Sequence, residues 1–428
     1  MCSHPRGQYD MNNSLVCASA VQVEDNKSLG FPIYILLFYL IAEYLRPLAL
    51  AAIRPALWAQ ILLALYLLSN IKKMEMVIKD KYFKYYVALL CLMIVHTFVA
   101  MNNYWAFKML SQMLSYLIIG VSFCVFADSV RKLHLLISFF VLLMVICALD
   151  RILGIGFLGA VGHMGDENDF ALAMNAALPI SFFLGRAGEG RIRWFYWSAT
   201  ALFVFANMLS ASRGGFLGML IVAAICWRYT KNRFMALVIV AFLGILAWSI
   251  TATTFKQEIR ELGVETVHTG TGKDRIELWK IGWRAFLDHP VLGVGQGNMP
   301  LVMEKYQYDS LGRSYWKRGM WGRAIHSVYF TLLPELGLVG LIILVLIFRN
   351  CLQKYRKIKE LCNEANSWGK FNRIESMNSA LLVAIIGFMV TGAFLSALYY
   401  PEFWNLSMLL VALYMVTSKL AARNSTVA

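Results

Sequence analysis

The chain has 428 residues, of which 59% are hydrophobic and 15% are charged. Soluble domains are about 45–50% apolar and about 25% charged, so this composition excludes a soluble globular enzyme, a disordered protein and a disulfide scaffold. The net charge of +15 would indicate nucleic acid in a soluble protein, but here we attribute it to membrane topology and to one anion site. We therefore predict an all-α polytopic membrane protein without a nucleic-acid partner.

Twelve apolar segments are candidate transmembrane helices. They are 31–46, 50–69, 85–101, 106–127, 133–150, 170–185, 194–211, 214–227, 234–252, 326–348, 379–399 and 401–418. The first is interrupted by polar residues and the eighth is short. The predicted organisation is a tail over 1–28, nine helices within 29–252, a large loop over 253–325, three helices within 326–418 and a tail over 419–428.

The orientation follows from the Lys and Arg residues of the short connections, which are enriched on the cytoplasmic side. With the N-terminus inside, the inside connections carry most of these residues. The short outside connections carry Arg46, Arg54, Lys108, Arg151 and Arg213. The pattern repeats along the chain, so it predicts that both termini are cytoplasmic and that the large loop lies outside the membrane.

The outside loop 253–325 is rich in basic residues and is long enough to escape the charge rule. Its stretch from Arg275 to Phe286 has apolar and basic residues at helical spacing. We expect amphipathic helices at the outer membrane surface. Lys273, Arg318 and Arg323 add to the positive charge of this loop.

Two basic side chains at outside helix ends are candidates for chemistry. Arg213 stands in Ser-Arg-Gly-Gly, where it either snorkels to the interface or offers a bidentate fork to a phosphate that the glycines let approach. His326 is expected as the first residue of the tenth helix, in His-Ser-Val-Tyr329. Nearby basic residues lower the pKa of a histidine and favour the neutral imidazole that a general base requires.

Acidic and aromatic residues mark the same side. Asp166 and Asp169 either begin a helix, with Asp166 or Asn168 as its cap, or contact substrate or a metal. Tyr400 belongs to an aromatic rim that either anchors the helices at the interface or stacks on sugars. Glu335, within an apolar segment, should be paired or protonated. The Gly-rich run 293–298 is interpreted as a turn, because no strand precedes it.

The order of these motifs resembles the O-antigen ligase superfamily. The motifs are Ser-Arg213-Gly-Gly, His289-Pro-Val-Leu-Gly-Val-Gly, His326-Ser-Val-Tyr and Pro-Glu335-Leu-Gly-Leu-Val-Gly. This superfamily includes O-antigen ligases, O-antigen and exopolysaccharide polymerases, and protein O-oligosaccharyltransferases. Residues 166–175 and Glu43-Tyr-Leu-Arg46-Pro look like a subgroup tied to exopolysaccharide systems. The family pattern often has Asn where this chain has Ser327.

The resemblance implies a glycosyl transfer at the periplasmic face of the bacterial inner membrane. The donor would be a glycan on undecaprenyl diphosphate and the acceptor a lipid or polysaccharide, without a cofactor or a bound metal. The family's catalytic residues match Arg213, Arg275 and His326. Lys273, Arg318, Arg323, Asp166, Asp169, Tyr329 and Tyr400 are the expected substrate contacts, and other polysaccharide-assembly proteins are expected as partners.

Three functions stay open at this point. A ligase that moves the glycan to lipid A core or to another surface acceptor is favoured over a polymerase that extends lipid-linked repeats. The two share the donor chemistry and differ in the acceptor. A transporter or flippase of lipid-linked sugars is the alternative of another class, and it should show internal repeats and polar residues spread across the membrane depth. No repeat is visible, and the candidate residues gather on the outer side.

Overall fold

The computed structural model contains helices and connections, and no strand, within the residues that it describes. These residues are 28–46, 52–155, 165–230, 232–234, 237–238, 241–242, 245, 270–316, 319–364 and 369–427. The helices before the large loop are α2 (Phe31–Tyr44), α3 (Pro55–Leu68), α4 (Ile71–Lys79), α5 (Lys81–Val99), α6 (Asn103–Phe126), α7 (Val130–Leu153), α8 (Glu167–Ala187), α9 (Gly190–Leu209) and α10 (Arg213–Arg228). Those that follow are α13 (Gly270–Asp288), α14 (Met299–Tyr306), α15 (Val328–Glu364), α16 (Gly369–Thr391), the 3-10 helix η2 (Gly392–Phe394) and α17 (Pro401–Val427).

Seven helices of the described chain are long and apolar enough to cross a membrane, namely α5, α6, α7, α8, α15, α16 and α17. The helices α2 and α3 are apolar but have 14 residues each. At 1.5 Å per residue, each is shorter than the hydrocarbon core of about 30 Å. The ninth predicted segment, 234–252, lies largely outside the described residues. The polytopic helical class is confirmed, and the number of twelve spans stays a prediction.

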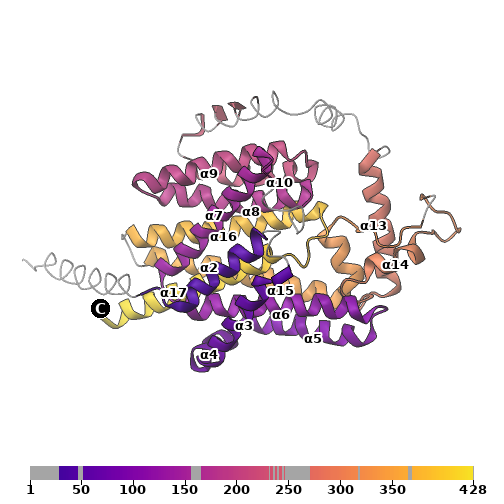
Figure 1. The fold of residues 1–428 in the computed structure, drawn as a ribbon, viewed down its shortest axis with the longest axis horizontal. Helices are drawn as coiled ribbons and strands as arrows, with labels where there is room; N and C mark the ends of the chain where they lie inside the picture. The colour runs from indigo at the N-terminus through magenta and orange to yellow at the C-terminus, as the bar shows by residue number, and fades with distance from the viewer. Residues whose placement is uncertain are drawn as a thin grey trace, which may run out of the picture.

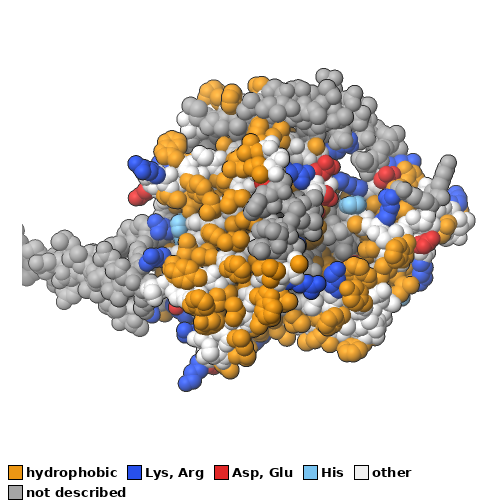
Figure 2. Space-filling model, in the orientation of Figure 1, with side chains coloured by type: hydrophobic (Ala, Val, Ile, Leu, Met, Phe, Trp, Pro, Cys, Tyr) orange, Lys and Arg blue, Asp and Glu red, His pale blue; other side chains and the backbone are white. Residues whose placement is uncertain are grey.

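The helices α5, α6, α8, α9, α16 and α17 run side by side, with α13 and α14 at one end of the bundle (Figure 1). Hydrophobic side chains cover the middle of the visible face, while charged side chains gather toward its ends (Figure 2). Many large apolar side chains are exposed, as expected for a lipid-facing surface. Phe98, for example, is 77% exposed. The molecule therefore has an apolar belt between two polar ends.

The connections that the charge pattern placed outside meet at one end of the bundle. The amide of Asn102 donates to Asn298 Oδ1 at 2.7 Å, and Ser212 Oγ donates to Asn168 Oδ1 at 2.8 Å. We call this the site end, defined by residues 102, 168, 212, 298 and 400. The alternation of connections agrees with the prediction, while the side of the membrane that this end faces stays a prediction.

Two connections expected as loops contain helix. The connection 70–84 includes α4, and α15 continues to Glu364 in place of ending at 348. Lys354 of this extension donates to Asp80 Oδ2 at 2.7 Å, and both side chains are almost buried. A helix satisfies its own backbone groups, so it continues beyond the apolar stretch where such pairs stabilise it.

The helix α15 is broken near its start, which was not predicted. Gly337 has a φ of 63°, and an added Cβ there would meet the carbonyl group of Val291. The break frees two carbonyl groups, which accept from the Gly-rich run: Val294 N–H donates to Pro334 O at 2.7 Å, and Gly295 N–H to Glu335 O at 3.0 Å. The predicted turn at 293–298 is thus confirmed, and it docks into the broken helix.

The helices of the large loop form a small lobe with its own apolar core. This core consists of Leu278, Ile281, Ala285, Met299, Val302, Met303, Tyr306, Met320 and Ile325. The lobe attaches to the bundle through the Trp279 ring, which stacks on Phe330 of α15 at 5.0 Å. The prediction of an amphipathic helix over 275–286 is confirmed by α13. Its position at the membrane surface stays a prediction.

Candidate functional site

Arg213 is the first residue of α10, which points its N-terminus toward the site end. Ser212 caps this helix by accepting the Gly215 N–H at 2.9 Å. A Cβ on Gly214 would come within 2.7 Å of Phe394, and one on Gly215 would meet Ala171 of α8. The two glycines are therefore required for close packing, and this packing fixes the position of the Arg213 backbone.

A buried amide network holds the helices around Arg213. Asn175 Nδ2 of α8 donates to Gly215 O at 2.8 Å and to Thr391 Oγ1 of α16 at 2.9 Å. Asn207 Nδ2 of α9 donates to Asn175 Oδ1 at 2.8 Å. Four helices thus share one set of hydrogen bonds in an apolar interior, where such bonds specify a single arrangement.

Arg275 lies on α13, across from Arg213. Its guanidinium carbon is 5.9 Å from the centre of the Phe394 ring, the same ring that covers Gly214. Burial and the charge of Arg213 lower the pKa of Arg275, while Asp166 and Glu167 raise it. Two partly desolvated guanidinium groups that repel each other make a site in which an anion is stabilised.

His326 precedes α15 and is not part of it, contrary to the prediction. Its φ of 57° is left-handed, and its N–H donates to Ser396 Oγ at 2.9 Å. The helix is capped by Ser327, whose hydroxyl oxygen accepts the Phe330 N–H at 3.4 Å. The family pattern often has Asn at position 327. In this chain, the Ser327 side chain at this position caps α15.

The surroundings of His326 favour a neutral imidazole. Burial lowers its pKa below the usual value, and the positive charges of Arg275 and Arg323 lower it further, while Asp166 opposes them. A neutral imidazole near pH 7 can accept a proton from a hydroxyl group.

The acidic segment adopts the cap geometry and also contacts the aromatic rim. Asp166 caps α8, accepting the N–H groups of Asn168 at 2.7 Å and Asp169 at 2.8 Å. Tyr400 Oη donates to Asp169 Oδ1 at 3.1 Å. Burial, followed by the carboxylate of Asp169, raises the pKa of Tyr400. Within the described residues, no three His, Cys, Asp or Glu side chains gather in a metal-binding arrangement.

The remaining predicted contacts are more dispersed. Lys273 Nζ lies 5.0 Å above the Tyr315 ring, on the loop lobe. Tyr329 Oη donates to Met389 O at 3.0 Å and is 38% exposed. Arg318 lies outside the described residues.

In the connection 392–400, Tyr400 was predicted as part of the site, whereas Phe394 and Ser396 were missed. This connection carries Phe394 and Ser396, which contact the candidate catalytic residues, and Tyr399, whose hydroxyl donates to Glu335 Oε2 at 2.8 Å. The Glu335 carboxylate also accepts the Gly297 N–H at 2.9 Å. The expectation that Glu335 is paired is confirmed, and its contacts are structural.

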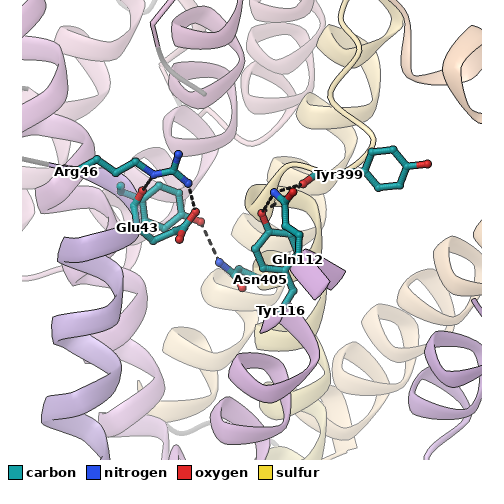
Figure 3. A network of polar contacts seen from close by, with 7 residues as sticks. Glu43, Arg46, Gln112, Tyr116, Tyr399 and Asn405 are labelled. Atoms are coloured by element: carbon teal, nitrogen blue, oxygen red, sulfur yellow. Dashed lines mark hydrogen bonds and ion pairs between the residues drawn. The ribbon is translucent and has the colours of Figure 1, made fainter. Parts of the chain in front are cut away.

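A second polar network supports the same connection from below (Figure 3). Gln112 Nε2 of α6 donates to Tyr116 Oη at 2.6 Å and to the Tyr399 carbonyl at 3.1 Å. Arg46 is paired with the buried Glu43 at 2.5 Å, and Figure 3 draws this pair in the same network. The signal for these residues was their polarity within apolar helices, but their partners could not be read from the sequence.

The site end thus brings together two arginines, a histidine and an acidic segment from α8, α10, α13 and the start of α15. Figure 2 shows basic, acidic and histidine side chains gathered toward this end. Such a set can bind a doubly charged anion and accept a proton beside it.

Comparison with known proteins gives one family match. No curated protein matches the chain. Residues 198–345 match the O-antigen ligase family model, and this range contains Arg213, Arg275 and His326. The chain is therefore a polytopic membrane protein in which residues 198–345 are similar to the O-antigen ligase family.

Proposed function

We propose that the protein transfers a glycan from undecaprenyl diphosphate to an acceptor hydroxyl at the site end, and that this end faces the periplasm from the bacterial inner membrane. The observation that carries this proposal is the meeting of Arg213, Arg275 and His326, which lie far apart in the chain but within the matched family domain. A ligase acting on lipid A core or another surface acceptor is the form we favour.

The two arginines act on the leaving group. When the bond between the anomeric carbon and the diphosphate breaks, negative charge grows on the departing oxygen. Arg213 and Arg275 are positively charged throughout, and together they neutralise that charge without a metal ion. The anion also relieves the repulsion that lowers the pKa of Arg275.

His326 acts on the acceptor. Its neutral imidazole takes the proton of the hydroxyl as the new bond to the anomeric carbon forms. The diphosphate leaves with the electron pair of the broken bond, so the reaction is a single displacement that inverts the anomeric centre. Asp166 helps to stabilise the imidazolium that results, because its carboxylate raises the pKa of His326.

The other polar residues contact the substrates in this scheme. Arg323 and Lys273 add positive charge around the diphosphate, while Asp169, Tyr329 and Tyr400 line the approach of the sugars. Arg318, outside the described residues, stays a candidate contact on the sequence alone. The Asp169–Tyr400 pair offers both an acceptor and a ring face to a sugar.

The test is glycan transfer by the purified protein in detergent and EDTA. The donor is undecaprenyl-diphosphate glycan, and the acceptors are lipid A core and a second lipid-linked repeat. We expect wild type to release undecaprenyl diphosphate with one of them, and the productive acceptor distinguishes ligase from polymerase. Arg213→Gln and Arg275→Gln should each lose most of the activity. Arg151→Gln is the matched control, because Arg151 lies at the same end but packs on Phe170.

Movement of the lipid-linked sugar across liposomes without any glycosidic bond would contradict the proposal and indicate a transporter. Full transfer by both arginine variants would contradict the assigned roles while leaving the transferase activity standing.

A further inference from the structure

A second polar site lies in the loop lobe, in a pocket of about 240 Å³. The pocket is lined by Glu277, Lys280, Ile281 and Arg284 of α13 and by Gln307, Asp309, Arg313, Ser314, Tyr315 and Trp316 of the following chain. None of these residues is needed for the transfer proposed above. Figure 1 shows α13 and α14 at the margin of the bundle.

The pocket and the candidate catalytic centre lie on opposite faces of α13. Arg284 follows Arg275 by nine residues, which is two and a half turns, so the two side chains point in opposite directions. The faces meet at the first turn of the helix. There Tyr315, which lines the pocket, donates its hydroxyl to Asp274 at 3.0 Å, and Lys273 lies over its ring. Tyr315 thus connects the pocket to residues 273 and 274, which directly precede Arg275 in the chain.

Two of the three cations that line the pocket are paired with carboxylates. Lys280 is paired with Glu277 at 2.8 Å, and Arg313 with Asp309 at 3.0 Å. Arg284 donates to the carbonyl group of Tyr306 at 2.8 Å. Arg284 leaves one positive charge in excess among the described lining residues, but all three cations are engaged by carboxylate or carbonyl oxygens. These contacts favour an uncharged, hydrogen-bonding ligand over a phosphate.

Two buried polar atoms of the lining lack a hydrogen-bond partner within the described chain. They are Gln307 Oε1, in a side chain that is 4% exposed, and Trp316 Nε1. The first needs a donor and the second an acceptor. A sugar hydroxyl is both. Tyr315, which is 43% exposed, offers a ring face for a sugar beside them.

We propose that this pocket binds a glycan chain at sugars remote from the reacting one. The inference rests on the proposed function in one respect, that the bound chain belongs to the donor or to the acceptor. Sugars held here steer the chain around α13 toward Arg275 and favour long substrates over short ones.

The first test measures binding alone. The probe is the oligosaccharide of several repeats released by mild acid from the producing strain's surface polysaccharide, without lipid or diphosphate. Calorimetry should detect its binding to wild type and to His326→Asn alike. Gln307→Met should weaken binding about fivefold, the loss expected for one hydrogen bond, and Tyr315→Ala at least as much. Tyr308→Ala is the matched control, because Tyr308 is an exposed tyrosine of the same segment outside the lining.

The second test compares kcat/KM for substrates of one repeat and of several repeats. Tyr315→Ala should lower the value for the long substrate about fivefold more than for the short one. Lengthening the donor and the acceptor in separate arms shows which of them the pocket holds. An equal loss at both lengths would indicate a merely structural role and overturn the proposal.

The two proposals can fail separately. Binding of the free oligosaccharide by a protein that forms no glycosidic bond would leave the glycan site standing without the transferase. Transfer by a wild type that does not bind the oligosaccharide would overturn the glycan site alone.

Discussion

At the scale of single residues, His326 combines an unusual backbone with a suitable environment. A left-handed φ of 57° is uncommon for a residue with a Cβ, and such conformations cluster at functional sites. The bond from its N–H to Ser396 holds the turn, while α15 begins two residues later. Residue type and sequence context made His326 a candidate general base. The left-handed turn depends on Ser396, 70 residues away, and could not be predicted.

The pH dependence of transfer should report the lowered pKa of His326. The base must be neutral, so kcat/KM should stay on its plateau at pH 7 and fall only at a pH below the usual histidine pKa. Arg323→Gln removes a charge that lowers this pKa, so the acidic limb should move to higher pH. The control is Lys305→Gln, because Lys305 is paired with Asp288. An unmoved limb in Arg323→Gln would contradict the electrostatic account.

At the scale of elements, the apolar segments predicted the helices well but not the break in α15. Amphipathic spacing predicted α13, because residues three and four positions apart lie on the same face of a helix, so the pattern depends on local sequence alone. The break depends on a distant segment. At the break the carbonyl groups of Pro334 and Glu335 lose their donors within the helix, and the N–H groups of residues 294 and 295 donate to them instead. Gly337 was visible in the sequence, but a glycine in an apolar segment does not by itself reveal a docked loop.

Gly337→Ala should destabilise the protein by about 1–3 kcal/mol, because its backbone conformation is nearly restricted to glycine. The added Cβ would also meet the Val291 carbonyl group. Gly312→Ala is the matched control: its φ is 70°, but nothing lies within 4 Å of the added Cβ. The apparent midpoint of thermal unfolding in detergent should fall further for Gly337→Ala. Equal unfolding midpoints for Gly337→Ala and Gly312→Ala would show that docking of the Gly-rich run into the broken helix adds nothing to stability.

At the scale of the whole molecule, the described parts of the predicted outside connections, at residues 102, 168, 212, 298 and 400, meet at one end of the bundle. Arg213 and Arg275 could be placed on one side by counting apolar segments, although 62 residues separate them in the chain. The partners within that end could not be predicted. Phe394 contacts Arg275 and packs against Gly214, the residue after Arg213, because α16 packs beside α8 and α10, and this packing is set by long-range contacts.

The orientation predicts which positions react from outside the cell. Leu311→Cys, at a position that is 70% exposed on the loop lobe, should react with a membrane-impermeant maleimide in spheroplasts. Lys357→Cys, exposed at the far end of α15, should react only after the membrane is opened. The unsubstituted protein gives the background from its own cysteines. The reverse pattern would contradict a periplasmic site end.

The central claim is that His326 accepts the proton of the acceptor during glycan transfer. Its most direct test is transfer by purified His326→Asn, because asparagine tolerates the left-handed backbone but cannot act as a base. We predict that this variant folds and binds undecaprenyl-diphosphate glycan as wild type does, while its transfer rate falls by about 10²–10⁴-fold. Transfer at the wild-type rate by a correctly folded His326→Asn protein would contradict the account.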